Sequence, residues 1–344
     1  MTIDYGTLKP SPTAMIGPDG TYRGGWFDGF DGSINPEDAG RGAGRLSAWL
    51  HVTFDTPNAF VGCHLADLGL AGHTAVLWVD KRTQHCDDRS ERQIWRGKSL
   101  RVDDAFARFD EPKTGSVIHM TDEGGVVFDV AARGLRLRGR ARPAFACPLV
   151  QTTAYPGAKG TLQWWGNLEL VEGELIRDGV RTRLPKGALG CYDRTLGHRR
   201  RIQNWNWLSA VGSLTRSKQD EKVPFALQMS KDRSGAQPQI ASQKYAAWVG
   251  DTMFKFQELS FAYETDLATG NTGPWKIDAQ AADASMALTF TPRFKRRERG
   301  YLPIFYRADF SQFYGDLAGE LTYQGEAYRL DPTFALVEDA YLRI

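Results

Sequence analysis

The densest group of reactive side chains in this chain lies between residues 190 and 207. The segment holds one carboxylate, Asp193, and one histidine, His198, together with four arginines and two tryptophans. A carboxylic acid in an apolar cavity keeps its proton near neutral pH, because burial disfavours the anion. Asp193 is therefore the first candidate for a proton donor. Glu338 and His198 are the further candidates for acid–base chemistry.

Aromatic side chains near this segment can line a cavity. Trp205 and Trp207 are two positions apart, so on a strand they share one face and Asn204 lies on the other. Trp165 follows Trp164 directly, so only one of these two rings can line a given cavity. Indole faces pack against apolar ligands and stabilise cations. We expect Trp205, Trp207, Trp165 and Asn204 to contact a ligand.

The arginines of the segment support a second interpretation. Arg194 and Arg199 can bind an acidic group of a ligand. A cation next to Asp193 would favour its ionised form, which argues against proton donation. A third interpretation is structural: a solvated basic loop in which Asp193 neutralises an arginine, followed by a core strand.

No standard metal or nucleotide motif is present. His51, His64, His73 and His85 follow no zinc-ligand spacing, so we expect them to be scattered over the strands, with no metal and no cofactor. The glycines at 40, 42 and 44 precede a strand pattern, whereas the glycines of a phosphate-binding turn precede a helix. We therefore expect no phosphate-binding turn there. The chain has no Gly-x-Ser-x-Gly elbow, which argues against a serine esterase.

Period-two alternation of apolar residues predicts the elements that carry these side chains. Between residues 46 and 54, one face of a strand is apolar, and Trp49, His51 and Thr53 lie on the other face. The Asp178-Gly179 pair between two such runs predicts a two-residue hairpin. The segment from Asp103 to Phe109 is the one candidate for a short helix.

Short strands with frequent glycine turns predict an all-β, antiparallel protein built from one or two barrels or sandwiches. The first 45 residues are rich in Gly, Asp and Pro, so we expect a wrapping segment there. Residues 139–160 interrupt the alternation with prolines and glycines. We therefore expect an N-terminal domain of residues 1–150 and a C-terminal domain of residues 151–344.

Composition limits the partners of the chain. Its 344 residues carry 43 basic and 41 acidic side chains, a net charge of +2, which gives no overall field to attract nucleic acid. No stretch reaches the roughly 20 apolar residues of a membrane helix, so we expect no integral membrane segment. The N-terminus is no secretory signal and the four cysteines form no Cys-x-x-Cys pair, so we expect a cytoplasmic protein.

Several motifs in order resemble domain-of-unknown-function family 2804. The central one is Asp193-x-x-x-Gly197 followed by Trp205-x-Trp207. The others are the segment from Asp67 to Gly72, Phe290-Thr291-Pro292, Gln312-Phe313-Tyr314-Gly315 before Gly319, and Val337-Glu338-Asp339. The chain departs from the family pattern at three places: Arg194, Leu196 and the Gln243-Lys244 pair, where relatives often have tryptophan, arginine and a glutamate–asparagine pair.

More remotely, the chain resembles the carotenoid-hydratase group of lipocalin-like double barrels, which bind or transform isoprenoids and lipids. This resemblance implies two lipocalin-like (calycin-like) barrels or sandwiches packed together, with a hydrophobic small molecule as partner. The oligomeric state stays open.

Three functions compete. The first is a metal-free hydratase (a lyase) or a cyclase (an isomerase), in which Asp193 protonates an isoprenoid-like or lipid-like alkene and indole faces stabilise the cation. The second is a non-catalytic carrier of a lipid or small molecule, with arginines holding an acidic head. The third is a carbohydrate-active β-protein, for which no carboxylate pair at glycosidase spacing can be named.

Overall fold

The computed structural model describes residues 8–69, 71–94, 100–233, 243–266, 269–270, 272–302 and 306–343. These residues form two compact units that divide after Arg199. We call residues 8–199 the N-terminal unit and residues 200–343 the C-terminal unit. The strand ladders in both units are antiparallel, so the predicted all-β, antiparallel fold is confirmed.

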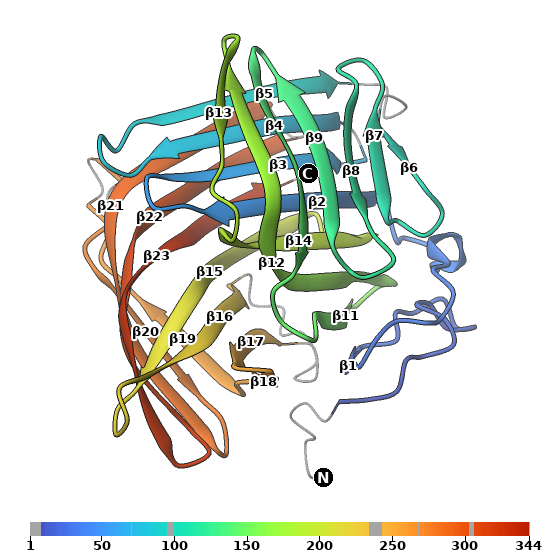
Figure 1. Cartoon of the computed structure of the whole chain (residues 1–344). Coiled ribbons are helices and arrows are strands. Elements are labelled where there is room, and N and C mark those ends of the chain that lie inside the picture. Colours follow the sequence, from blue (N-terminus) through green and yellow to red (C-terminus); the bar gives the residue numbers. More distant parts are fainter. Residues whose placement is uncertain are drawn as a thin grey trace. The chain divides into compact units, whose positions relative to one another are not determined.

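The described part of the N-terminal unit contains a 14-stranded sheet. Its main order is β5-β4-β3-β2-β14-β12-β10-β9-β8-β7-β6, and β1, β11 and β13 extend it from β12 (Figure 1). The strands are β1 (Gly25–Phe27), β2 (Leu46–Asp55), β3 (Ala59–Asp67), β4 (Ala71–Asp80), β5 (Cys86–Ile94), β6 (Arg101–Val102), β7 (Arg108–Glu111), β8 (Ser116–Met120), β9 (Val126–Ala132), β10 (Leu135–Pro143), β11 (Leu149–Tyr155), β12 (Lys159–Arg177), β13 (Val180–Arg183) and β14 (Leu189–His198).

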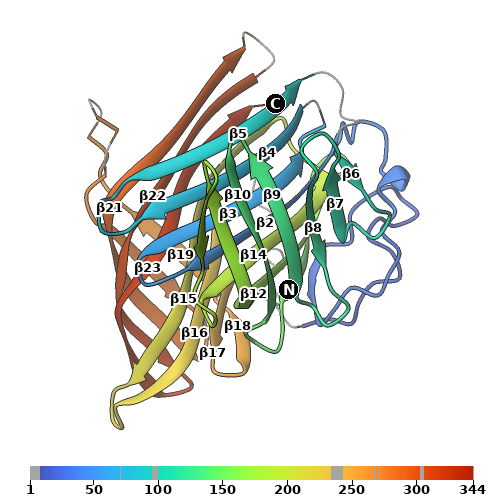
Figure 2. The same ribbon diagram turned by 45° about the horizontal axis from the view of Figure 1, so that its top comes forward.

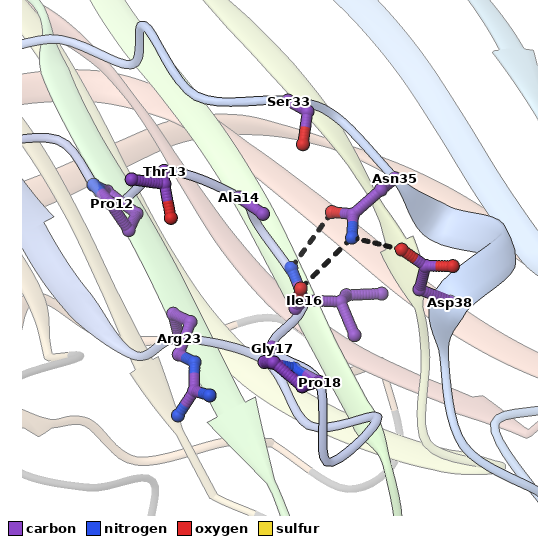
Figure 3. Close-up of a pocket in the computed structure, with 10 residues that line it drawn as sticks. All are labelled: Pro12, Thr13, Ala14, Ile16, Gly17, Pro18, Arg23, Ser33, Asn35 and Asp38. Atoms are coloured by element: carbon purple, nitrogen blue, oxygen red, sulfur yellow. Dashed lines mark hydrogen bonds between the residues drawn. The ribbon is translucent and has the colours of Figure 1, made fainter.

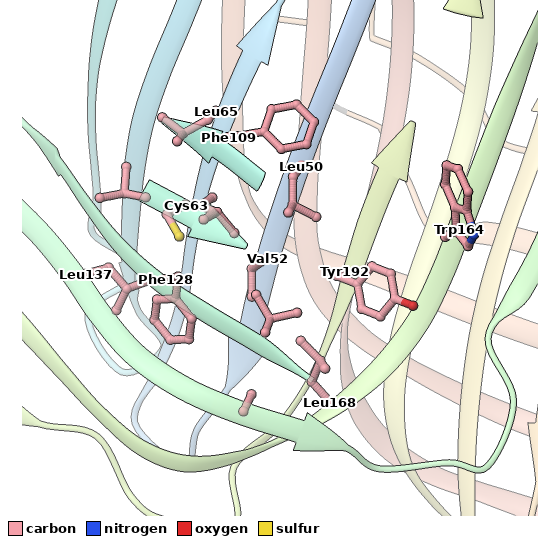
Figure 4. Packing of buried hydrophobic residues seen from close by; sticks show 14 of the residues in the cluster. Leu50, Val52, Cys63, Leu65, Phe109, Phe128, Leu137, Trp164, Leu168 and Tyr192 are labelled. Atoms are coloured by element: carbon pink, nitrogen blue, oxygen red, sulfur yellow. The ribbon is translucent and has the colours of Figure 1, made fainter. Parts of the chain in front are cut away.

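Alternation along β2 separates two faces, as the sequence predicts. Leu50, Val52 and Phe54 are fully buried in one apolar cluster (Figure 4), while Trp49 and His51 lie on the opposite face. The sheet curls around this cluster, which we call the N-terminal core. Its curl brings β9 back against β2, because Phe54 stacks on Phe128 with ring centroids 5.5 Å apart.

Two connections between strands test the predicted turns. Asp178 and Gly179 join β12 to β13 with φ of 49° and 87°, so the predicted two-residue hairpin is confirmed. The short helix expected from Asp103 to Phe109 is wrong. Asp103 Oδ1 accepts the backbone N–H groups of Ala107 and Arg108, and this closes a turn between β6 and β7.

The first described residues wrap the N-terminal unit with little regular structure, as expected. They contain β1 and one 3-10 turn, η1 (Pro36–Asp38). Asn35 holds this segment together: its side chain accepts the Ile16 N–H and donates to the Ile16 carbonyl, both at 3.0 Å, and also bonds Asp38 (Figure 3).

The C-terminal unit has a nine-stranded sheet in its described part, in the order β18-β17-β16-β15-β23-β22-β21-β20-β19 (Figure 2). The strands are β15 (Ile202–Arg216), β16 (Glu221–Asp232), β17 (Lys244–Val249), β18 (Thr252–Lys255), β19 (Glu258–Ala262), β20 (Trp275–Gln280), β21 (Ala284–Leu302), β22 (Tyr306–Tyr323) and β23 (Glu326–Arg343). This sheet also curls around an apolar cluster, since Phe254 on β18 stacks on Tyr323 of β22 at 4.2 Å.

The glycines of the family motifs lie where neighbouring strands approach closely. A Cβ on Gly197 would lie 2.1 Å from the carbonyl oxygen of Gly160 on β12. A Cβ on Gly315 would lie 2.1 Å from the carbonyl oxygen of Thr291 on β21, beside a register shift in the β21–β22 ladder. These positions require glycine because any other side chain would push the backbones apart.

The boundary expected at residues 150/151 falls inside β11, which pairs with β12 in the N-terminal sheet. The compact units of the structure divide after Arg199 instead. A division into separately folding domains stays a prediction. Across the described residues, no helix is long and apolar enough to cross a membrane.

Candidate functional site

Asp193 lies on β14, where three donors from neighbouring positions converge on its carboxylate. Trp165 Nε1 and Thr195 Oγ1 donate to Oδ1 at 2.8 and 2.6 Å, and Trp49 Nε1 donates to Oδ2 at 3.0 Å. The two indoles come from β12 and β2, the strands on either side of β14. Asp193 is half-buried, whereas Trp165 is 2% exposed. An indole nitrogen can only donate, so the pair fixes the carboxylate between two rings.

The neighbours of Asp193 in sequence point to the opposite face of β14. Residues 192, 194 and 196 face the N-terminal core, and Arg194 lies there over the Trp164 ring at 3.5 Å. Among the described residues, Asp193 makes no ion pair. Arg194, which the sequence suggested would favour the ionised form of Asp193, therefore lies on the other face of the strand. Arg199 contacts the outer part of the site, with its guanidinium 4.5 Å above the ring of Trp49.

Further polar side chains extend the Asp193 face. Gln163 Nε2 donates to Thr195 Oγ1 at 3.1 Å, which orients the hydroxyl that donates to Asp193. His51 on β2 is the cross-strand partner of Asp193, and His64 on β3 is the partner of His51. Direct cross-strand partners share a face of the sheet.

The histidines were expected to be scattered, and this expectation is wrong for three of them. The His51 and His64 rings meet edge to face at 5.8 Å, and His64 Nε2 lies 2.8 Å from His73 Nδ1. Strand pairing of β2, β3 and β4 brings them together despite their separation in sequence. Their positions on the polar face of alternating strands were the available signal. Within the described ranges, no three His, Cys, Asp or Glu side chains are placed to share a metal ion.

A second carboxylate is held in a similar way in the C-terminal unit. Glu338 on β23 accepts from Trp205 Nε1 at 3.1 Å and from Gln312 Nε2 at 2.9 Å. Trp207 is the cross-strand partner of Glu338 and is 5% exposed. Gln312 in turn accepts from Tyr314 and Arg296. Three motifs quoted from the sequence, on β15, β22 and β23, therefore meet at Glu338.

The remaining predicted residues lie elsewhere. Asn204 is on the other face of β15 from Trp205, where its Oδ1 accepts from Arg233 Nη2 at 2.8 Å. His198 is buried at the end of β14, and its hydrogen bonds among the described residues are to Tyr22: the ring at 2.8 Å and the backbone N–H at 3.0 Å. His198 thus anchors the wrapping segment and is not brought together with Asp193.

Trp49, Thr195 and Gln163 belong to the Asp193 site, although sequence reasoning missed them as site residues. Each lies on the polar face of a strand whose other face is apolar, and this pattern was visible for Trp49. What the sequence did not give is the order of strands that sets β2, β14 and β12 side by side.

A pocket of about 630 Å³ opens in the wrapping segment, between residues 12 and 38 (Figure 3). It is lined by Pro12, Thr13, Ala14, Ile16, Gly17, Pro18, Arg23, Ser33, Asn35 and Asp38. None of the predicted site residues belongs to this lining. The pocket and the Asp193 site are therefore separate features of the N-terminal unit.

Comparison with known proteins gives one family and several solved structures, two of which are described below. No curated protein matches the chain. A structure from Nitrosomonas europaea, provisionally described as AttH, is 14% identical, covers 88% of this chain and 95% of its own, and has a TM-score of 0.51. Kievitone hydratase from Nectria haematococca is 14% identical over 86% of this chain and 88% of its own, with a TM-score of 0.46. The first likeness shows a shared fold.

The family model described as a domain of unknown function (DUF2804) matches residues 166–344. The matched range begins within β12, and it includes Asp193, the Trp205-x-Trp207 pair and Glu338. It covers just over half of the chain. The chain belongs to the DUF2804 family.

Proposed function

We propose that this protein is a hydratase that adds water to a carbon–carbon double bond of a hydrophobic, isoprenoid-like small molecule, with Asp193 as the proton donor. The observation that supports this most strongly is the position of Asp193 between the indoles of Trp49 and Trp165. A fixed acid beside aromatic rings suits a reaction that passes through a carbocation.

The hydrogen bonds indicate which oxygen carries the proton. Oδ1 accepts two hydrogen bonds, from Trp165 and Thr195, whereas Oδ2 accepts one, from Trp49. A carboxyl oxygen has two lone-pair sites, so Oδ2 has room for a proton. The transferred proton is therefore assigned to Oδ2.

The reaction balances without a cofactor. The alkene π electrons take the Oδ2 proton, which leaves a carbocation and the Asp193 carboxylate. Water then attacks the cation, and the oxonium loses its extra proton to the carboxylate. The product is the alcohol, and Asp193 is regenerated.

Turning Arg194 to the other face of β14 removes one of the two cations that would favour the ionised form of Asp193, and the other, Arg199, lies over the ring of Trp49. The described hydrogen-bond donors to Asp193 are two indoles and a hydroxyl, all neutral, and none of them is a guanidinium. If the Asp193 carboxyl has no role in catalysis, the alternative is a carrier that binds the small molecule without converting it.

The test uses acyclic isoprenoids (farnesol, geranylgeraniol, squalene and lycopene) incubated with the full-length protein in heavy-oxygen water. Mass spectrometry of extracted products should show a hydrated species that carries the heavy oxygen. Asp193→Asn should lower its rate of formation by about 100-fold or more, because an amide cannot donate the proton. The matched control, Asp19→Asn, changes an exposed carboxylate of the same unit and should leave the rate unchanged. Equal rates for the Asp193 variant and the wild type would exclude the proposal.

A further inference from the structure

Arg194 places a positive charge on the apolar face of β14. It is flanked on this face by Tyr192 and Leu196, both members of the N-terminal core. Across the sheet its partners are Trp164 on β12 and Leu50 on β2, which also belong to this core. A charged group in such surroundings loses hydration that only a partner can replace.

The described residues provide few hydrogen-bond partners for the Arg194 guanidinium. Among the described residues, Arg194 donates one hydrogen bond, from Nη2 to the carbonyl oxygen of Ala105, at the long distance of 3.5 Å. Its Nε is buried and has no acceptor, and no carboxylate forms an ion pair with it in the described part of the chain. A guanidinium has five N–H donors, so the hydrogen bond to Ala105 uses only one of them within the described part of the protein. Burial lowers the pKa of Arg194 to about 10, and the charge of Asp103, in the turn between β6 and β7, partly opposes this shift.

Tyr192 offers a second donor on the same face. It lies two residues before Arg194, and its hydroxyl makes no hydrogen bond with the described residues. Figure 4 shows Tyr192 and Trp164 among the side chains of the N-terminal core, and Trp164 is the ring that Arg194 covers. Burial raises the pKa of Tyr192 to about 12, so the hydroxyl keeps its proton at neutral pH. The guanidinium and the hydroxyl are close enough to interact electrostatically, so both can donate to one anionic group.

The surroundings indicate an apolar tail on that anion. Arg194 keeps partial exposure under the turn between β6 and β7, which contributes Ala105. The partly buried apolar side chains that pack against the N-terminal core include Phe106 in this turn, Val102 on β6 and Phe30. Phe30 also contacts the edge of Trp164 at 6.2 Å. A ligand that reaches Arg194 from solvent would therefore meet apolar surface.

We infer that Arg194 and Tyr192 form a binding site for the carboxylate of a lipophilic monocarboxylic acid. The planar fork of a guanidinium matches the two oxygens of a carboxylate, and a single negative charge balances the single cation. The acyl chain lies against Phe30, Val102 and Phe106. The site is on the opposite face of β14 from Asp193, so it does not depend on the hydratase proposal.

The test compares decanoate with decanol, which has the same chain and no charge. Binding to the full-length protein is followed by isothermal titration calorimetry and by tryptophan fluorescence, which should respond because Trp164 lies under Arg194. Decanoate should bind saturably at one site. Decanol and acetate should each bind at least about tenfold more weakly, since one lacks the charge and the other the tail.

Variants assign the binding to these residues. Arg194→Met should weaken decanoate binding by about tenfold or more, and Tyr192→Phe by a smaller factor. Arg177→Met is the matched control, because Arg177 also covers an indole, that of Trp78 at 4.2 Å, but is exposed. This control should bind decanoate like the wild type.

The comparison of decanoate with decanol uses the wild-type protein, so it tests the carboxylate site even if a variant folds poorly. Equal affinity for the two ligands, or full decanoate binding by a folded Arg194→Met variant, would overturn the assignment. Asp193→Asn should bind decanoate normally, so failure of the hydratase proposal and failure of this site are distinguishable.

Discussion

Asp193 and Glu338 belong to different units, yet each is fixed by an indole N–H from a neighbouring strand. Because an indole nitrogen only donates, the carboxyl oxygens must accept, and their orientation follows from the strand pairing. The acids could be singled out from the sequence. Their donors could not, since Trp49 and Gln312 are far from them along the chain.

Glu338→Gln tests this arrangement in the C-terminal unit. The new amide must turn its own donors toward Trp205 or Gln312, so one buried hydrogen bond is lost and two donors face each other. Chemical denaturation should show a loss of about 1–3 kcal/mol in the free energy of unfolding. The control Glu320→Gln changes an exposed side chain and should leave that free energy unchanged. Equal stability of both variants would show that these hydrogen bonds contribute nothing.

His198 gives a prediction about pH. Burial lowers the pKa of His198 below its ordinary value of 6.5, so the folded state takes up this proton less readily than the unfolded state. The contribution of His198 to stability is therefore present above pH 6.5 and is lost as the pH falls through the folded pKa.

Denaturation curves between pH 7 and pH 5 should show a weaker pH dependence for His198→Gln than for the wild type. Tyr22→Phe keeps the histidine and removes its hydrogen bonds, so it should lower stability at every pH by about 1–2 kcal/mol. An unchanged pH dependence in His198→Gln would contradict the assignment of this titration.

At the scale of the strand, β14 carries two different chemistries because its side chains alternate. Asp193 and Thr195 face a polar surface, whereas Tyr192, Arg194 and Leu196 face the N-terminal core. From the sequence alone, the neighbouring Arg194 would be expected to favour the ionised form of Asp193. Because side chains alternate along a strand, Arg194 faces away from Asp193. This conclusion requires knowing that residues 189–198 form a strand and not a solvated loop.

The motif glycines are also explained at this scale, and Gly315→Ala tests the explanation. Its methyl group would lie 2.1 Å from the Thr291 carbonyl oxygen, so β21 and β22 must separate there. We expect the free energy of unfolding to fall by about 1–3 kcal/mol. Gly273→Ala is the control, because a Cβ there meets no atom within 4 Å. It should change stability by less than about 0.5 kcal/mol. Similar effects of the two substitutions would show that close approach is not why Gly315 is needed.

At the scale of the whole molecule, the all-β, antiparallel fold could be predicted because alternation is a local property of the sequence. The division into units could not. Residues 139–160 read as a linker on composition, but they form the end of β10, all of β11 and the start of β12 within one sheet. Most of their prolines and glycines lie at strand ends or in turns of that sheet, which composition does not distinguish from a linker.

The two units also separate the residues that the sequence grouped together. Asp193 and Trp165 belong to the N-terminal unit, and Trp205, Trp207 and Glu338 to the C-terminal unit. Nearness along the chain suggested a single cavity wall. Strand pairing instead builds one carboxylate–indole cluster in each unit.

The most direct test of the hydratase proposal is heavy-oxygen incorporation into acyclic isoprenoids by the wild type and by Asp193→Asn, with the melting temperature measured beside it. Hydrated, labelled product from the wild type and a loss of about 100-fold or more in the folded variant is the predicted result. Labelled product formed at the same rate by a folded Asp193→Asn variant, or no hydration of any of the four isoprenoids by the wild type, would contradict it.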